Sequence, residues 1–247
     1  LPVLELARQP LMAKARANGI AMLSVRKAHH FSAVWPDIEP FAREGFVALA
    51  MINSMASVVP HGGHRKVYGT NPFGFAAPRD GMDPLVFDQA SSAMANGDVQ
   101  IARREGRQLP PGTGVDRHGA PTTDPASILD GGALLPFGGH KGSSIAMMIE
   151  IMGAALAGGD YSFEIDWSAY PGAATPHGGQ TYILIDPQRG AVNSFADRLE
   201  VLIDEIHDAG QSRLPGDRRY ATRRDSLASG IAVDAAALAE LRALAAE

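Results

Sequence analysis

A glycine-rich loop at residues 136–143 is the segment whose residue types point most directly to chemistry. It reads PFGGHKGS and stands just before a long apolar run. Such loops present unpaired backbone N–H groups to an anion, and the dipole of a following helix adds to the attraction. Lys141 could pair with a phosphate here, although a solvated lysine beside a helix cap is an equal alternative. The loop is not a Walker A motif, because Gly142 separates Lys141 from Ser143.

A second candidate region runs from residue 64 to residue 99. It holds a turn, YGTNP, at residues 68–72 and a short apolar strand, residues 84–88, that ends on an acid. The next residues, QASS, are small and polar, so that a ligand can approach the backbone closely. Binding groups often lie on loops held by a rigid scaffold, although structural turns use the same residues. We therefore expect the site to extend from this region to Lys141 and His177.

Several common kinds of active site are not favoured. The chain has no cysteine, which excludes thiolate catalysis and thiolate zinc sites. Its eight histidines form close pairs only at residues 29–30 and 61–64, and neither pair has the HExxH context of a zinc protease. We therefore expect no metal. Neither the GxSxG motif of serine hydrolases nor the GxGxxG fingerprint of Rossmann folds occurs in the chain.

The elements that must position these residues alternate between helices and strands. This order predicts an α+β (α/β layered) fold, with site residues at the strand ends. The run at residues 144–157 is apolar nearly all round except for Glu150, which predicts a buried helix. Residues 108–125 are expected to form a long loop, and Arg213 begins a basic loop. The expected strands are residues 20–25, 46–52, 84–88, 181–185 and 231–233, and the other helices are 11–17, 38–44, 98–105, 195–207 and one capped by Asp234.

The composition of the chain limits the kinds of partner that it is expected to bind. The chain has 247 residues and a formal net charge of −5, which argues against a nucleic-acid surface. Its longest apolar run falls short of the ~20 residues that a membrane span requires. There is no signal-peptide pattern at the start, so a cytoplasmic location is expected. From the residues alone, the chain is an enzyme-like domain that binds an anionic ligand through glycine-rich turns.

Five motifs in a fixed order add a family resemblance. They are HHFSA at 29–33, GTNP at 69–72, DQASS at 88–92, PTTDP at 121–125 and GGHKG at 138–142. Together they resemble the malate/L-lactate dehydrogenase family of NAD(P)-dependent oxidoreductases, and within it the Δ1-piperideine-2-carboxylate/Δ1-pyrroline-2-carboxylate reductase branch. The resemblance implies a mostly antiparallel sheet flanked by helices, a non-Rossmann NAD(P)-binding fold, a homodimer, and NADPH as cofactor, with NADH as the alternative.

The resemblance also assigns site residues. Thr70 would hydrogen-bond the substrate carboxylate, and Lys141 would lie near the cofactor phosphates. The segment at Gly216–Arg219 would close over the dinucleotide, where its arginines could favour a 2′-phosphate. The residues implied to bind the cofactor are His30, Phe31, Ser32, Ala33, Val34, Trp35, Asp88, Gln89, Ala90, Lys141, His177, Gly216, Asp217, Arg218 and Arg219.

The family's proton donor has no match here. The family carries it as a histidine in a Ser-His-Gly segment near the N-terminus, whereas both His-Gly-Gly runs of this chain follow a proline, Pro60 or Pro176. We therefore expect the general acid upstream of this chain and assign no catalytic residue within it. The expected domains are an NADPH-binding domain at 31–220 and a second domain, made of 1–30 and 221–247 with that upstream segment.

The resemblance implies reduction of a cyclic imino acid by hydride transfer. Δ1-Piperideine-2-carboxylate would give L-pipecolate, and Δ1-pyrroline-2-carboxylate would give L-proline. One alternative is a 2-hydroxy-acid dehydrogenase of the malate or lactate type, since no residue separates C=N from C=O reduction. Another is a non-catalytic nucleotide-binding fragment. The expected partners are a small carboxylate substrate and a second copy of the chain, without nucleic acid or membrane.

Overall fold

The computed structural model describes residues 2–29, 33–166, 168 and 177–245. The chain divides into two units, Leu1–Ile203 and Asp204–Glu247. The domain boundaries expected at residues 31 and 220 stay a prediction.

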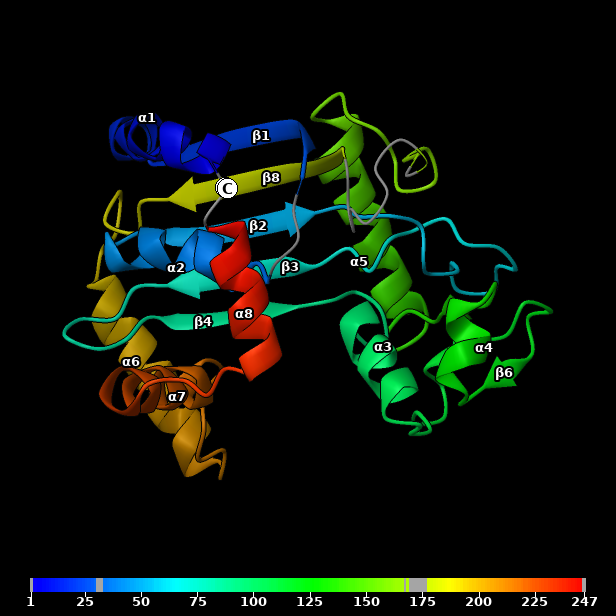
Figure 1. Cartoon of the computed structure of the whole chain (residues 1–247). Coiled ribbons are helices and arrows are strands. Elements are labelled where there is room, and N and C mark those ends of the chain that lie inside the picture. The colour runs from blue at the N-terminus through cyan, green and yellow to red at the C-terminus, as the bar shows by residue number, and fades with distance from the viewer. Residues whose placement is uncertain (1, 30–32, 167, 169–176, 246–247) are drawn as a thin grey trace. The chain divides into compact units, whose positions relative to one another are not determined.

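A five-stranded sheet dominates the first unit, and all of its pairings are antiparallel. Strand β8 lies between β1 and β2, although it follows them by more than a hundred residues (Figure 1). The expected mixed fold with a mostly antiparallel sheet is confirmed. The strands, in spatial order, are β1 (Ile20–Ala28), β8 (Gly178–Ile185), β2 (Val47–Ile52), β3 (Phe73–Ala77) and β4 (Leu85–Gln89).

Helical segments cover both faces of this sheet, as two neighbouring residues of β8 show. The hydroxyl of Tyr182 donates to Asp37 in α2 (Trp35–Arg43) at 2.9 Å. The hydroxyl of Thr181 donates to the carbonyl of Met152 in the π-helical turn η1 (Ile151–Ala155) at 2.7 Å. Successive strand residues point to opposite faces, so α2 and η1 lie on opposite sides. Helix α1 (Pro2–Asn18) contributes Leu4, Leu11 and Ala15 to the core on the α2 side.

The main error in the expected packing concerns the helix that was expected to be buried on all sides. Helix α5 spans His140–Glu150, begins earlier than expected and passes directly into η1. Its apolar side chains do not all face inward, because one side packs on the sheet and the other faces solvent. The exposed large apolar residues of this stretch are Met147, Met148, Ile151 and Leu156.

A smaller lobe of the first unit holds a three-stranded sheet in the order β6-β5-β7. Helices α3 (Asn96–Arg104) and α4 (Pro125–Leu129) pack beside it around Val99 and Ile128. Two of its strands interrupt the loop expected at residues 108–125, so that expectation is wrong in part. The three strands are β5 (Gly114–Val115), β6 (Pro121–Thr122) and β7 (Ala133–Leu134).

The second unit is helical in its described residues. It contains the end of α6 (Phe195–Asp208), then α7 (Asp217–Ser229) and α8 (Ala235–Leu244). Asp234 caps α8 as expected, since its side chain accepts from Ala236 N at 2.9 Å. The strand expected at residues 231–233 is absent from this described stretch, and the expected basic loop gives way to α7 at Asp217. No helix in the described part of the chain has the length and apolar character needed to cross a membrane.

Candidate functional site

A cleft of about 570 Å³ opens in the first unit where β2 and β4 end and where α2 and α3 begin. Its wall combines small apolar residues with a few hydroxyl, amide and carboxylate groups, as ligand sites commonly do. Five segments that are distant in sequence contribute to it. The lining residues come from 33–34, 52–57, 70–72, 88–90 and 95–100.

Asp88 joins two of these segments. Its Oδ2 atom accepts hydrogen bonds from the backbone N–H groups of Val34, at 2.7 Å, and Trp35, at 3.1 Å. The first N–H groups of a helix lack partners within the helix, and Val34 provides no side-chain cap for α2. A carboxylate from β4 therefore caps α2 and fixes one wall of the cleft.

Thr70 lines the cleft beside the residues that follow β2. Its hydroxyl lies 3.4 Å from that of Ser54, and its carbonyl accepts from Ser91 N at 2.8 Å and from Ser91 Oγ at 3.0 Å. The preceding Gly69 is required by the tight approach, because a Cβ atom there would lie 2.5 Å from the carbonyl oxygen of Ser54. The tight turn expected at residues 68–72 is not present in this described stretch. Tyr68 bridges to Val58, and the next four residues form an irregular link to β3 that places Thr70 at the cleft.

The structure brings part of the predicted site together. Ala33, Val34, Asp88, Gln89 and Ala90 line the cleft with Thr70, as the cofactor and substrate assignments require. Trp35 does not line it and is linked to it through Asp88. His30, Phe31 and Ser32 lie outside the described residues.

Lys141 and His177 do not line this cleft. Lys141 is exposed in the first turn of α5, close to a separate hollow of about 360 Å³ bordered by His61 and Gly139. His177 has a left-handed backbone, φ +58, and its Nδ1 atom lies 3.9 Å from a carboxylate oxygen of Asp160. The roles predicted for both residues remain predictions.

Gly216, Asp217, Arg218 and Arg219 belong to the second unit. Gly216 has φ +95 and precedes α7, while Asp217 accepts a hydrogen bond from Leu214 N at 2.8 Å. The four residues thus form a defined helix start, and Gly216, Arg218 and Arg219 line a shallow hollow of about 350 Å³ within that unit. Their role toward the dinucleotide remains a prediction.

A buried polar cluster behind the cleft was missed by sequence reasoning. The carboxylate of Glu150, which is 4% exposed, accepts from Asn71 Nδ2 at 2.7 Å and from Ser162 N at 3.0 Å. Asn53 Nδ2 lies 3.5 Å from the same carboxylate. The available signal was Glu150 itself, a single acid within an apolar run, but its partners come from three distant segments.

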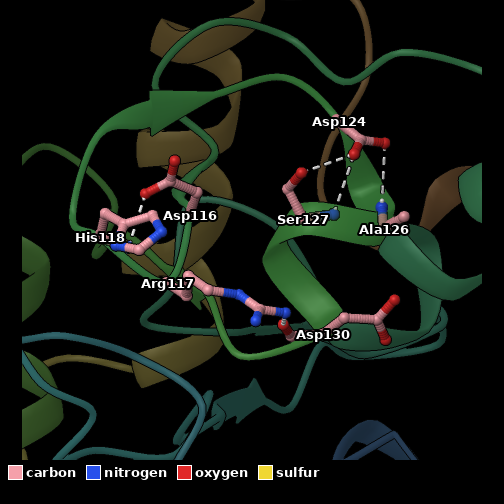
Figure 2. Close-up of a pocket in the computed structure, with 7 residues that line it drawn as sticks. All are labelled: Asp116, Arg117, His118, Asp124, Ala126, Ser127 and Asp130. Atoms are coloured by element: carbon pink, nitrogen blue, oxygen red, sulfur yellow. Dashed lines mark hydrogen bonds between the residues drawn. The ribbon is translucent and has the colours of Figure 1, made fainter.

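Another hollow lies on the small sheet, and its polar groups are already engaged (Figure 2). Asp124 accepts from Ala126 N and from the hydroxyl and N–H of Ser127. These bonds, that from the hydroxyl foremost, hold the pKa of Asp124 below its usual value. Asp116 closes a turn by accepting from His118 N at 2.8 Å. Because these carboxylates cap a short helix and a turn, we place the candidate site in the larger cleft.

Comparisons with known proteins cover almost the whole chain. Residues 1–242 match the family model described as malate/L-lactate dehydrogenase. The chain is 58% identical over 244 residues to a Δ1-pyrroline-2-carboxylate/Δ1-piperideine-2-carboxylate reductase of Pseudomonas syringae pv. tomato, covering 99% of this chain and 71% of the relative. A reductase of the same name from Pseudomonas putida is 54% identical over 243 residues, covering 98% and 71%.

Solved structures agree with these matches. The crystal structure of Δ1-piperideine-2-carboxylate reductase from P. syringae has a TM-score of 0.96 and 58% identity, covering 98% of this chain and 73% of that one. A dehydrogenase from Sinorhizobium meliloti has a TM-score of 0.84 and 31% identity, covering 98% and 72%.

Proposed function

Because the chain belongs to the malate/L-lactate dehydrogenase family of oxidoreductases, we propose that it reduces cyclic imino acids with NADPH. The substrates are Δ1-piperideine-2-carboxylate, which gives L-pipecolate, and Δ1-pyrroline-2-carboxylate, which gives L-proline. The observation that carries this proposal is the 58% identity, over 99% of the chain, to a relative named for reduction of both imines. The fold alone does not identify this substrate class, because dehydrogenases of other names have the same fold.

The cleft fits the nicotinamide cofactor that the family implies. Ala33 and Ala90 leave room for a flat ring, and no atom lies within 4 Å of the position a Cβ would take at Gly97. The cofactor supplies a hydride when bound. Asp88, held by the N–H of Val34, keeps the wall in place. Lys141 would meet a phosphate, and the proposed preference for NADPH rests on Arg218 and Arg219.

Thr70 is the proposed partner of the substrate carboxylate. Thr70 lines the cleft, its backbone carbonyl is held by Ser91 and its hydroxyl contacts that of Ser54, so the proposed donor is positioned before the ligand binds. A fixed donor loses little freedom on binding, which orients the ring carbon for hydride addition. As the hydride adds to the ring carbon, the C=N double bond becomes a single bond, and the ring nitrogen takes a proton from the general acid expected upstream of this chain.

The proposed assembly is a homodimer. The apolar residues exposed along α5, η1 and the residue that follows, Met147, Met148, Ile151 and Leu156, support an interface of this kind. Light scattering of the purified protein tests the proposal, which predicts twice the mass of the chain. A monomeric mass at micromolar concentration would contradict it.

The deciding experiment is NADPH oxidation with each cyclic imine and, in parallel, with pyruvate and oxaloacetate. Turnover of the imines alone supports the proposal. The family description favours a second candidate, a 2-hydroxy-acid dehydrogenase, and a higher kcat/KM for an oxo acid would select it. The assay uses protein that includes the upstream segment in which the general acid is expected, and no turnover with any substrate would then leave a nucleotide-binding role. Repeating the imine assay with NADH tests the cofactor preference.

A further inference from the structure

Glu150 is a buried acid whose carboxyl oxygens are hydrogen-bonded by neutral groups. Besides Asn71 Nδ2 and Ser162 N, its carboxylate accepts from the hydroxyl of Ser162. Within the described residues, no lysine or arginine forms an ion pair with it. Burying a carboxylate without a cation is costly unless several hydrogen bonds satisfy it. The arrangement therefore points to a positioning role that an apolar residue could not fill.

The partners of Glu150 stand directly beside the cleft residues. Asn71 follows Thr70, and Asn53 precedes Ser54. The side-chain oxygen of Asn71 accepts from Ser54 N at 3.3 Å, and the hydroxyls of Ser54 and Thr70 lie 3.4 Å apart. A continuous set of hydrogen bonds thus links Glu150 through Asn71 to the two cleft hydroxyls.

Asn71 depends on Glu150 more than Asn53 does. Asn53 is held independently, since it accepts from Gly179 N at 2.6 Å and donates to the carbonyl of Asp160 at 2.9 Å. Asn71 is fully buried and has a left-handed backbone, φ +37, which costs energy in a residue other than glycine. Its 2.7 Å bond to Glu150 is its shortest side-chain bond in the described structure.

We propose that Glu150 is a positioning residue for substrate recognition. By fixing the amide of Asn71, it sets where Thr70 and Ser54 place their hydroxyls, and so how tightly the cleft holds the substrate carboxylate. This role rests on the proposed function, in which Thr70 binds that carboxylate. It requires no contact between Glu150 and the substrate.

The test compares Glu150→Gln with the wild-type chain. The substitution keeps the shape, but it turns one oxygen into an NH₂ group that faces the donors of Asn71 or Ser162. The expected result is a KM for the cyclic imine raised about tenfold, the effect of roughly one hydrogen bond. We expect kcat to change less than about twofold, and the dissociation constant of NADPH to stay the same. The matched control is Glu105→Gln, whose side chain is 53% exposed and pairs with Arg107.

A double variant distinguishes positioning of Thr70 by Glu150 from a general loosening of the cleft. If Glu150 acts through Thr70, adding Glu150→Gln to Thr70→Val should raise KM no further than Thr70→Val does alone. The proposal would be overturned if the effects of the two substitutions on KM multiplied in the double variant. A wild-type KM in Glu150→Gln would also overturn it. If Glu150→Gln fails to fold, Asn71→Gly replaces it, because glycine adopts the same backbone and removes only the linking amide. That variant should show the same rise in KM, and an unchanged KM would overturn the proposal.

Failure of the positioning role of Glu150 can be distinguished from failure of the proposed function. If the wild-type protein, assayed with the upstream segment in which the general acid is expected, reduces neither imine, the proposed function is wrong. Binding of pyridine-2-carboxylate with NADPH is then measured by calorimetry. This planar carboxylate resembles the imine ring but cannot be turned over by the same route. A dissociation constant about tenfold higher in Glu150→Gln would still support the positioning role. Equal constants in both proteins, or no binding to the wild-type chain, would overturn it.

Discussion

The carboxylate of Asp88 accepts a hydrogen bond from the backbone N–H of Val34 at 2.7 Å, across 54 residues of sequence. A residue near the end of β4 thus caps α2 and closes one wall of the cleft. Because the N-terminus of α2 holds this carboxylate through backbone N–H groups, the position of the carboxylate is set before any ligand binds.

Removing this cap should cost both stability and binding. Asp88→Ala leaves the N–H groups of Val34 and Trp35 without their partner, so we expect the free energy of unfolding to fall by about 1–3 kcal/mol. The dissociation constant of NADPH should rise, because the wall of the cleft loosens. Urea denaturation and fluorescence titration measure the two effects. Asp80→Ala, at an exposed position, is the control, and equal stability of the two variants would contradict the capping role.

Lys141→Ala tests the proposed phosphate contact. If the ammonium group meets a cofactor phosphate, NADPH binding should weaken by roughly 1–3 kcal/mol, with no loss of thermal stability. Calorimetric titration gives the affinity. Lys14→Ala removes an exposed lysine from α1 and should leave binding unchanged. An unaltered affinity in Lys141→Ala would remove this residue from the site.

Thr70→Val keeps the side-chain shape but removes the hydroxyl. The KM of the imine should rise while the dissociation constant of NADPH stays the same, because only the carboxylate contact is lost. Steady-state kinetics and NADPH titration check the two quantities. Thr222→Val makes the same change on the exposed surface of α7 and serves as the control. A weaker affinity for NADPH with an unchanged KM would count against the assignment.

A matched pair of glycine substitutions tests the close packing behind Thr70. A Cβ atom at Gly69 would lie 2.5 Å from Ser54 O and 2.6 Å from Asn71 Oδ1. Gly69→Ala should therefore lower the free energy of unfolding by about 1–3 kcal/mol. Gly97→Ala meets no atom within 4 Å and lies in a helix, where alanine is favoured by up to about 1 kcal/mol. Thermal denaturation should show opposite shifts, and similar shifts would contradict the packing argument.

The ion pair between Arg79 and Glu200 predicts a pH dependence. The guanidinium donates to both carboxylate oxygens at 2.8 Å, and its hydrogen bonds hold the pKa of Glu200 below its usual 4.5. A lowered folded-state pKa means that the stabilisation is present above the usual pKa and is lost as pH falls through the lowered value. Since Glu200 is 40% exposed, we expect only about 0.5–1 kcal/mol.

The measurement is the free energy of unfolding of Glu200→Gln and wild type between pH 7 and pH 3. The difference should be largest at neutral pH and should shrink in acid. Glu205→Gln, at an exposed position, controls for loss of a carboxylate. A difference that grows as the pH falls would have the wrong sign for this pair.

The family resemblance made much of the cleft predictable. Asp88 and Thr70 were assigned because the DQASS and GTNP motifs resemble those of the family, and both line the cleft. The local pattern alone predicted a strand that ends on an acid, which is confirmed, and a turn around Thr70, which is not present in the described structure. Strand β3 was not expected, because three of the five residues in its FGFAA sequence are Gly or Ala, which are depleted in strands. Packing explains that sequence, since a Cβ atom at Gly74 would lie 2.7 Å from Ile38 Cδ1.

The cluster around Glu150 could not be predicted in the same way. Its members are Asn53 just after β2, Asn71 just before β3, Glu150 at the end of α5, and Ser162, and no local pattern relates them. The expected burial of α5 was wrong for a related reason. Periodicity reports which residues are apolar, but tertiary contacts decide which of them are covered.

The place of β8 in the sheet also sets an order for synthesis on the ribosome. Strands β2, β3 and β4 pair with their neighbours in sequence, so this meander can form as soon as it has emerged. Strand β1 is different, because its only partner in the described sheet is β8. Strand β1 must therefore wait for this partner until residues 178–185 leave the exit tunnel. During that interval the nascent chain exposes both β1 and the open edge of β2, where chaperones or neighbouring chains can bind.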